Sequence, residues 1–121
     1  MALYANRPLS EASVTTYYAD ISTTGSAFVV SPWRGKITRA YSVIGAAITS
    51  ADASWTMEIN GVAVTGVSVV VANASSAPGD VDIGIPTAAN YVNEGDTIEF
   101  LADGESTTTS PVAFTAVIER D

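Results

Sequence analysis

The chain has 121 residues, with 5 Lys and Arg against 13 Asp and Glu, so its formal net charge is −8, and it contains neither His nor Cys. The missing Cys excludes disulfides, thiolate nucleophiles and Cys-based metal sites, and the missing His removes the commonest general base and metal ligand. The negative charge disfavours nucleic acid as a direct partner, because such binding draws its affinity from Lys and Arg. A binding or structural role is therefore favoured over catalysis.

The composition is that of a β protein. Ile and Val together number 23 and Leu numbers 3, while Thr adds 14 further β-branched residues. Branched side chains are restricted in helices and pack well on a pleated sheet. No window carries the apolar stripe of an amphipathic helix, so we expect an all-β chain with no long helix.

The chain shows no membrane or export signal. No run approaches 18 consecutive apolar residues, and the first residues lack the cationic and apolar regions of a signal peptide. We expect a soluble protein without a membrane partner, made in a reducing compartment.

Eight short alternating runs, separated by turn residues, predict eight strands. In chain order these are residues 12–21, 26–30, 36–49, 53–60, 62–72, 80–86, 97–102 and 112–119. Between the fourth and fifth runs stands Asn60-Gly61, the dipeptide that supplies both positive-φ residues of a type I′ hairpin. These two strands are therefore expected to pair.

Eight antiparallel strands in one domain favour a two-sheet jelly-roll sandwich over residues 12–121, preceded by an N-terminal arm, residues 1–11. In that topology the fourth and fifth strands are neighbours, in agreement with the hairpin. An immunoglobulin-like sandwich is the main alternative, although its Cys…Trp…Cys spacing is absent.

The third predicted strand cannot alternate strictly. If Ile37 faces the core, alternation also turns Arg39 inward, and an unpaired buried Arg would be costly. A β-bulge near residues 38–40 would place Ile37 and Ala40 inward and leave Arg39 in water.

Carboxylates are the only abundant groups that could carry acid–base or metal chemistry. In the run 80–86, Asp80 and Asp82 share one face and the apolar residues share the other, which we interpret as a solvent face rather than a calcium site. A glycosidase-like pair could be drawn from Asp52, Glu58, Glu94 and Glu99. No P-loop, nucleophile elbow or dinucleotide motif occurs, and no catalytic, metal or cofactor-binding residue is predicted.

Two features predict contact with protein. Arg34, Lys36 and Arg39 place three of the five cations within six residues, directly after Trp33. Trp and Arg are enriched in interface anchors, so this turn could dock on an acidic surface. A charged turn with a partly buried Trp is the more common explanation of such a loop. The arm 1–11 could lay apolar side chains across a neighbour or be a frayed terminus.

Apolar residues are also expected on the outward faces of the strands. They are Val70 and Leu101 in one sheet and Ala113 and Val117 in the other. A patch shared by two strands would form the seam of a homo-oligomer, as a dimer or a trimer.

Three stretches resemble the small jelly-roll decoration, or cement, proteins of tailed-bacteriophage heads. They are VSPWRGKITRAYSVIGAAITSADASW, EINGVAVTG and NYVNEGDTIEFLADGESTTTSPVAFTAVIER. The likeness covers roughly residues 26–120 and rests on turns: Pro-x-x-Gly before the third strand, Asn-Gly, Gly-Asp and Asp-Gly. Trimeric tumour-necrosis-factor-like and C1q-like heads share some of these turns.

The resemblance implies a protein with no enzymatic activity or cofactor. It would be made in the host cytoplasm, bind the major capsid protein on the outer surface of the virion, and stabilise the shell by bridging subunits. The candidate docking residues are Leu3, Tyr4, Arg7, Leu9, Trp33, Arg34, Lys36 and Arg39.

Two other functions stay open. One is a carbohydrate- or receptor-binding β-sandwich module of a virion, in which Trp33, Tyr17 or Tyr18 would stack on sugar rings, since Trp55 is expected in the core. The other is a carboxylate-based hydrolase, which requires two facing acids in a pocket.

Overall fold

The computed structural model describes residues 10–104 and 106–121, which form nine β-strands and no helix. The strands are β1 (Glu11–Tyr18), β2 (Gly25–Val30), β3 (Gly35–Ile44), β4 (Ala53–Ile59), β5 (Val62–Val71), β6 (Val81–Gly84), β7 (Tyr91–Val92), β8 (Thr97–Ala102) and β9 (Val112–Arg120). Among these residues no helix has the length and apolar character needed to span a bilayer.

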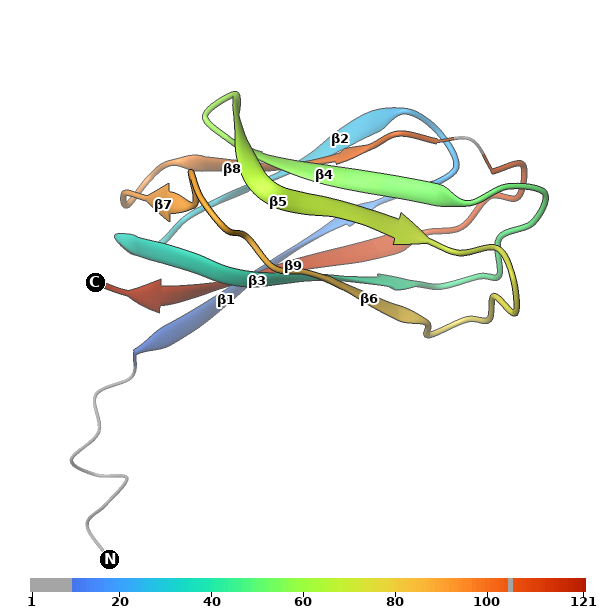
Figure 1. The fold of residues 1–121 in the computed structure, drawn as a ribbon, viewed down its shortest axis with the longest axis horizontal. Coiled ribbons are helices and arrows are strands. Elements are labelled where there is room, and N and C mark those ends of the chain that lie inside the picture. Colours follow the sequence, from blue (N-terminus) through green and yellow to red (C-terminus); the bar gives the residue numbers. More distant parts are fainter. Residues whose placement is uncertain (1–9, 105) are drawn as a thin grey trace, which may run out of the picture.

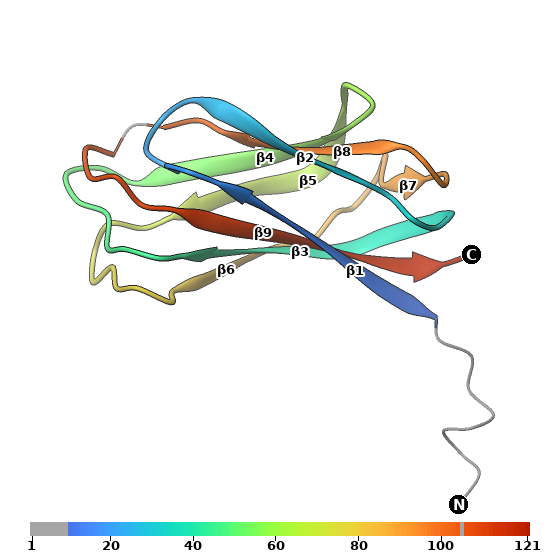
Figure 2. The same cartoon turned by 180° about the vertical axis from the view of Figure 1, so that it is seen from behind.

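The strands form two antiparallel sheets packed face to face (Figures 1 and 2). Sheet A has the order β1-β9-β3-β6, with β7 also paired to β3, and sheet B has the order β2-β8-β4-β5. Most connections cross from one sheet to the other, which is the winding of a jelly roll and not the hairpin-rich order of an immunoglobulin domain. The predicted all-β sandwich is confirmed.

Each of the eight predicted strands has a counterpart, and the ninth strand, β7, was missed. Two residues long, β7 pairs only with Gly35 and Lys36 at the start of β3. A strand of this length has no periodicity to recognise. The third predicted strand, 36–49, also ends early, at Ile44.

The Asn60-Gly61 hairpin is confirmed. Asn60 has φ +49° and Gly61 has φ +82°, the two positive values that a type I′ turn requires. The turn joins β4 to β5, and Ile59 pairs with Val62.

The predicted bulge in β3 is also confirmed. The register with β9 shifts between Ile37 and Arg39, so that Thr38 is the extra residue. Ile37 and Ala40 are fully buried, while the side chain of Arg39 keeps 35% of its exposure.

Three aromatic rings form the centre of the core between the sheets. Trp55 lies 5.8 Å from Phe100 and 5.2 Å from Phe114, and the rings of Phe100 and Phe114 stack 4.8 Å apart. Trp55 comes from β4, Phe100 from β8 and Phe114 from β9, so the cluster joins the two sheets. Trp55, Met57 and Ile59 alternate inward as predicted.

The orientation expected for β6 is wrong. Val81, Ile83 and Ile85 are exposed, whereas Asp82 is half-buried and Gly84 is buried. A Cβ at position 84 would lie 2.9–3.0 Å from methyl groups of Val69 and Val67, so only glycine fits where this edge strand packs on sheet B. The alternation then turns the apolar residues toward solvent.

Candidate functional site

The residues of the predicted basic turn lie at one end of the sandwich, beside the C-terminus. At the start of the turn, the hydroxyl of Ser31 donates a hydrogen bond to the carbonyl oxygen of Trp33, with 2.7 Å between the two oxygens. Gly35 then brings β3 against β9 so closely that a Cβ would lie 2.1 Å from the carbonyl oxygen of Glu119. We call this region, with the ends of β1, β3 and β9, the Trp33 end (left in Figure 1).

The Trp33 end collects all four cations of the described residues. Arg34 lies 3.7 Å from Asp121, and the guanidinium of Arg120 stands 4.9 Å from the centroid of the Trp33 ring. The four cations are Arg34, Lys36, Arg39 and Arg120. The fifth cation of the sequence, Arg7, falls outside the described residues, three positions before Ser10.

Three of the four cations, Arg34, Lys36 and Arg39, have a carboxylate beside or opposite them. Both terminal nitrogens of Arg39 donate to Glu11, at 3.3 and 3.5 Å, and its Nε donates to Tyr41. The hydrogen bond to Glu11 is the main reason that the pKa of Arg39 rises above its ordinary value. Lys36 lies opposite Glu119 in the β3–β9 register. The sequence therefore located the cations correctly, but the surface is mixed in charge rather than basic.

A shallow hollow of about 220 Å³ lies on the Trp33 end. Its walls combine an aromatic ring, two cations and two anions: Pro32, Trp33, Arg34, Glu94, Arg120 and Asp121. Trp33 is half-buried there, so a partner that binds at this hollow could contact the exposed part of the ring and the charged side chains around it.

The opposite end of the sandwich carries carboxylates without cations among the described residues. These acids stand next to strand ends: Asp20 after β1, Asp52 before β4, Asp80 before β6 and Asp103 after β8. We call this region the acidic end (right in Figure 1). The net charge of the chain is thus distributed unevenly along its long axis.

The outer face of sheet A carries an apolar strip that the sequence interpretation did not foresee. One row across the four strands consists of Tyr17, Ala113, Val43 and Val81. A second row consists of Thr15, Thr115, Tyr41 and Ile83. Neither row contains a charge. The alternation of apolar and acidic residues in 80–86 does indicate part of this strip, but the sequence pattern predicts the apolar residues on the inner face of the sheet and the structure has them on the outer face.

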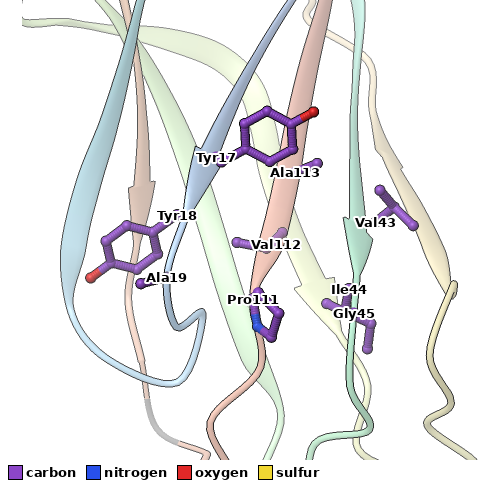
Figure 3. A pocket seen from close by; sticks show the side chains of 9 residues that line it. All are labelled: Tyr17, Tyr18, Ala19, Val43, Ile44, Gly45, Pro111, Val112 and Ala113. Atoms are coloured by element: carbon purple, nitrogen blue, oxygen red, sulfur yellow. The ribbon is translucent and has the colours of Figure 1, made fainter.

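A groove of about 540 Å³ opens where this strip meets the acidic end (Figure 3). It runs between the ends of β1, β3 and β9 and is lined mainly by Tyr17, Val43, Gly45, Pro111 and Ala113. Tyr17 keeps 77% of its exposure beside it. Tyr18 points to the other side of β1 and bonds Thr23, so of these two neighbouring tyrosines it is Tyr17 that presents a free ring.

The predicted oligomer residues fall on the faces expected, with unequal exposure. Val70 is exposed, and Leu101 and Ala113 are half-buried. Val117 keeps only 7% of its exposure on the outer face, where Arg39 and Ser13 are its cross-strand neighbours. In sheet B, Leu101 is separated from Val70 by β4. The docking candidates Leu3, Tyr4, Arg7 and Leu9 lie outside the described residues.

Of the candidate acid pairs, the fold brings together only Glu58 and Glu99, which face each other across β4 and β8. They lie on the outer face of sheet B, and Ser26 donates to Glu99. Neither carboxylate lines the hollows described above, and Asp52 and Glu94 lie near opposite ends.

Asp80 and Asp82 have no third acidic neighbour with which to hold a metal ion, and within residues 10–104 and 106–121 no such cluster occurs. Burial, followed by repulsion from Asp80, raises the pKa of Asp82. This shift follows from the position of Asp82 on the inner side of β6, opposite Ser42.

The sequence matches no protein-family model and no curated protein. Among solved structures, the chain is similar to a protein in the capsid asymmetric unit of cyanophage Pam1, with a TM-score of 0.53 and 14% identity over 96% of this chain and 90% of that one. It is similar to a family 35 carbohydrate-binding module from Clostridium thermocellum, with a TM-score of 0.51 and 15% identity over 88% and 92%.

A third similar structure is the catalytic unit of a thermostable GH87 α-1,3-glucanase from Streptomyces thermodiastaticus, with a TM-score of 0.52 and 14% identity. The match covers 93% of this chain, which spans about a quarter (26%) of the glucanase chain. At these identities the three likenesses establish the shared β-sandwich fold.

Proposed function

We propose that the chain is a non-catalytic decoration protein that binds the outer surface of a phage capsid through its Trp33 end and stabilises the shell. The observation that carries this proposal is the charge asymmetry of the described residues: their cations and the half-buried Trp33 occupy one end, and the other end has acids with no cation beside them. The fold likeness to a chain of the cyanophage Pam1 capsid supports it, because that likeness spans nearly the whole of both chains.

The Trp33 end is suited to docking on a protein surface. Trp33 supplies a central aromatic contact, and the surrounding ion pairs can exchange partners with charges on the shell. The β framework is rigid, so little ordering is required on binding. Many modest contacts repeated over a capsid then act together.

The acidic end would face outward in this arrangement. Asp20, Asp52, Asp80 and Asp103 would give the decorated particle a negative outer layer, and like-charged particles repel one another. This orientation places the major capsid protein, the proposed partner, on the opposite side from the acids.

Co-sedimentation tests the proposal. The purified chain is mixed with capsids of the parent virus that lack it, and the bound fraction is measured while salt is raised. We expect saturable binding that weakens with salt, because exposed charges are screened over about 8 Å at physiological ionic strength. Undecorated capsids should disrupt at a lower temperature.

Two variants that each lower the net charge by one make the test specific. Arg34→Ala removes a cation at the Trp33 end, and Ala72→Glu adds an acid at an exposed position near the acidic end. The first should weaken capsid binding and the second should leave it unchanged. Absence of binding to any form of the capsid contradicts the proposal.

Carbohydrate binding is a second candidate function, favoured by one observation. Tyr17 presents an exposed ring beside an apolar groove, as a sugar-stacking platform would, and the fold resembles a family 35 carbohydrate-binding module. A glycan panel titrated against the chain and Tyr17→Ala tests it. Binding that the substitution abolishes supports this function, and a flat response excludes it.

A further inference from the structure

We propose that two copies of this chain associate through the outer face of sheet A, with Tyr17 of each copy seated in the groove of the other. This inference concerns a different surface from the Trp33 end, so it stands or falls independently of capsid binding.

The outer face of sheet A has the size that a stable interface needs. The ten residues of β3 extend about 33 Å, and four strands side by side are about 19 Å wide, which gives a face of about 600 Å² before side-chain relief. A standard-size interface buries roughly 800 Å² on each partner. The accessible area of the face exceeds its flat area because side chains project from it, so an interface of standard size would have to cover the whole face.

The chemistry of the face favours burial. Tyr17, Val81 and Ile83 keep 77%, 61% and 49% of their exposure. Three polar side chains of the second row are already paired, since Thr15 bonds Thr115 and the hydroxyl of Tyr41 accepts from Arg39, and the hydroxyl of Tyr17 lies at the tip of its exposed ring. Covering the strip would leave few unsatisfied polar groups.

A second copy of the chain can bind to this face although each copy has a net charge of −8. No ionised side chain lies in either row, so two copies can meet here without placing carboxylate against carboxylate. The outer face of sheet B differs, because Glu58 and Glu99 stand at its centre. Like charges brought together there would repel.

The shape of the face is self-complementary. A protruding ring, Tyr17, stands directly beside a concave site lined by Val43, Gly45, Pro111 and Ala113 (Figure 3). In a two-fold symmetric pair each surface patch meets itself, so one projection and one adjacent groove satisfy both copies at once. A buried Tyr in such a groove is a common energetic hot spot.

Sedimentation velocity of the isolated chain tests this pairing without a capsid. Interfaces of standard size have dissociation constants of about micromolar or tighter, so the chain should be a dimer at about 100 μM. Tyr17→Ser and Ala113→Glu should each weaken the dimer at least tenfold, or about 1.4 kcal/mol. Phe28→Ser, at an exposed position on the outer face of sheet B, should not. Circular dichroism confirms that each variant is folded.

Salt separates this contact from capsid docking. Raising salt should tighten the dimer, because it screens the repulsion between two acidic chains that meet through the two uncharged rows. A monomer at about 100 μM overturns the inference. So does a dimer that Phe28→Ser disrupts and Tyr17→Ser does not, or a monomer in which Tyr17 binds a glycan or the capsid.

Discussion

The guanidinium of Arg120 lies 4.9 Å from the centroid of the Trp33 ring. This contact joins the last residues of β9 to the turn that precedes β3, two segments that are 87 positions apart in the sequence (120 − 33). The pairing of Arg34 with Asp121 connects the same two segments. The end of the sandwich is therefore held by side chains that also face solvent.

Trp33 and Arg120 should matter more for docking than for folding. An exposed cation–π contact contributes about 0.5–1 kcal/mol, so Arg120→Ala should lower the free energy of unfolding by no more than about 1 kcal/mol. Trp33→Ala should reduce capsid binding at least tenfold, as expected of an aromatic anchor. Urea unfolding and co-sedimentation measure the two effects. A Trp33→Ala chain that binds capsids normally contradicts this expectation.

Ser42 and Ser31 provide a matched pair of buried hydroxyls. Within the described residues, the Oγ of Ser42 has no hydrogen-bond partner, whereas that of Ser31 donates to the carbonyl of Trp33 at 2.7 Å. Removing an unsatisfied buried hydroxyl relieves a desolvation cost of about 1–3 kcal/mol. Removing a satisfied one leaves its hydrogen-bond partner without a hydrogen bond. Ser42→Ala should therefore raise the free energy of unfolding and Ser31→Ala should lower it. Equal effects in urea unfolding would refute the distinction.

Asp82 and Asp96 should have opposite effects on the pH dependence of stability. Burial and then Asp80 raise the pKa of Asp82 above 3.8, while the backbone N–H of Asn93, at 2.7 Å, and then Asn60 lower the pKa of Asp96. A raised folded-state pKa gives stability that is present below the unfolded pKa and lost as pH rises through the folded one. A lowered pKa gives stability that is lost as pH falls through it.

Asn substitutions test these signs. Asp82→Asn should be more stable than the parent chain at pH 7, and the gain should vanish below the unfolded pKa of about 3.8. Asp96→Asn should be less stable at pH 7, and its deficit should shrink as pH falls below that value. Urea unfolding at neutral and acidic pH measures both. A pH-independent difference in either variant is incompatible with the shifts.

The extra residue of the bulge is Thr38, because Ile37 pairs with Ile118 and Arg39 pairs with the adjacent Val117. Deleting Thr38 would leave Ile37, Arg39 and Ala40 in strict alternation on the faces they already occupy, so the shortened chain should fold and lose no more than about 3 kcal/mol of stability. Thr38→Ala keeps the bulge and removes only a 3.5 Å hydrogen bond to Val117, so it should cost less than about 1 kcal/mol. Thermal unfolding measures both variants, and a deletion variant that does not fold would argue against Thr38 as the extra residue.

Local patterns were sufficient for the parts of the fold that depend on neighbours in sequence. The alternation of Trp55, Met57 and Ile59 identified a buried face, and Asn60-Gly61 identified the hairpin, because turn chemistry and strand register act over a few residues. The bulge followed from the cost of burying Arg39 alone.

The orientation of β6 and the charge balance of the Trp33 end depend on contacts distant in sequence. Either face of 80–86 could have been the buried one, and the outcome was decided by the fit of Gly84 against sheet B. Similarly, the sequence places Arg34 and Arg39 close together, but their acidic partners, Asp121 and Glu11, come from opposite ends of the chain. Only the folded sandwich brings these groups into contact.

The most direct measurement is an electron cryo-microscopy structure of the chain bound to the capsid of its parent virus. We predict that Trp33, Arg34 and Lys36 lose their solvent exposure against the shell, while Asp52 and Asp103 point away from it. A particle on which the acidic end faces the shell, or on which this chain occupies no position, would contradict the proposed function.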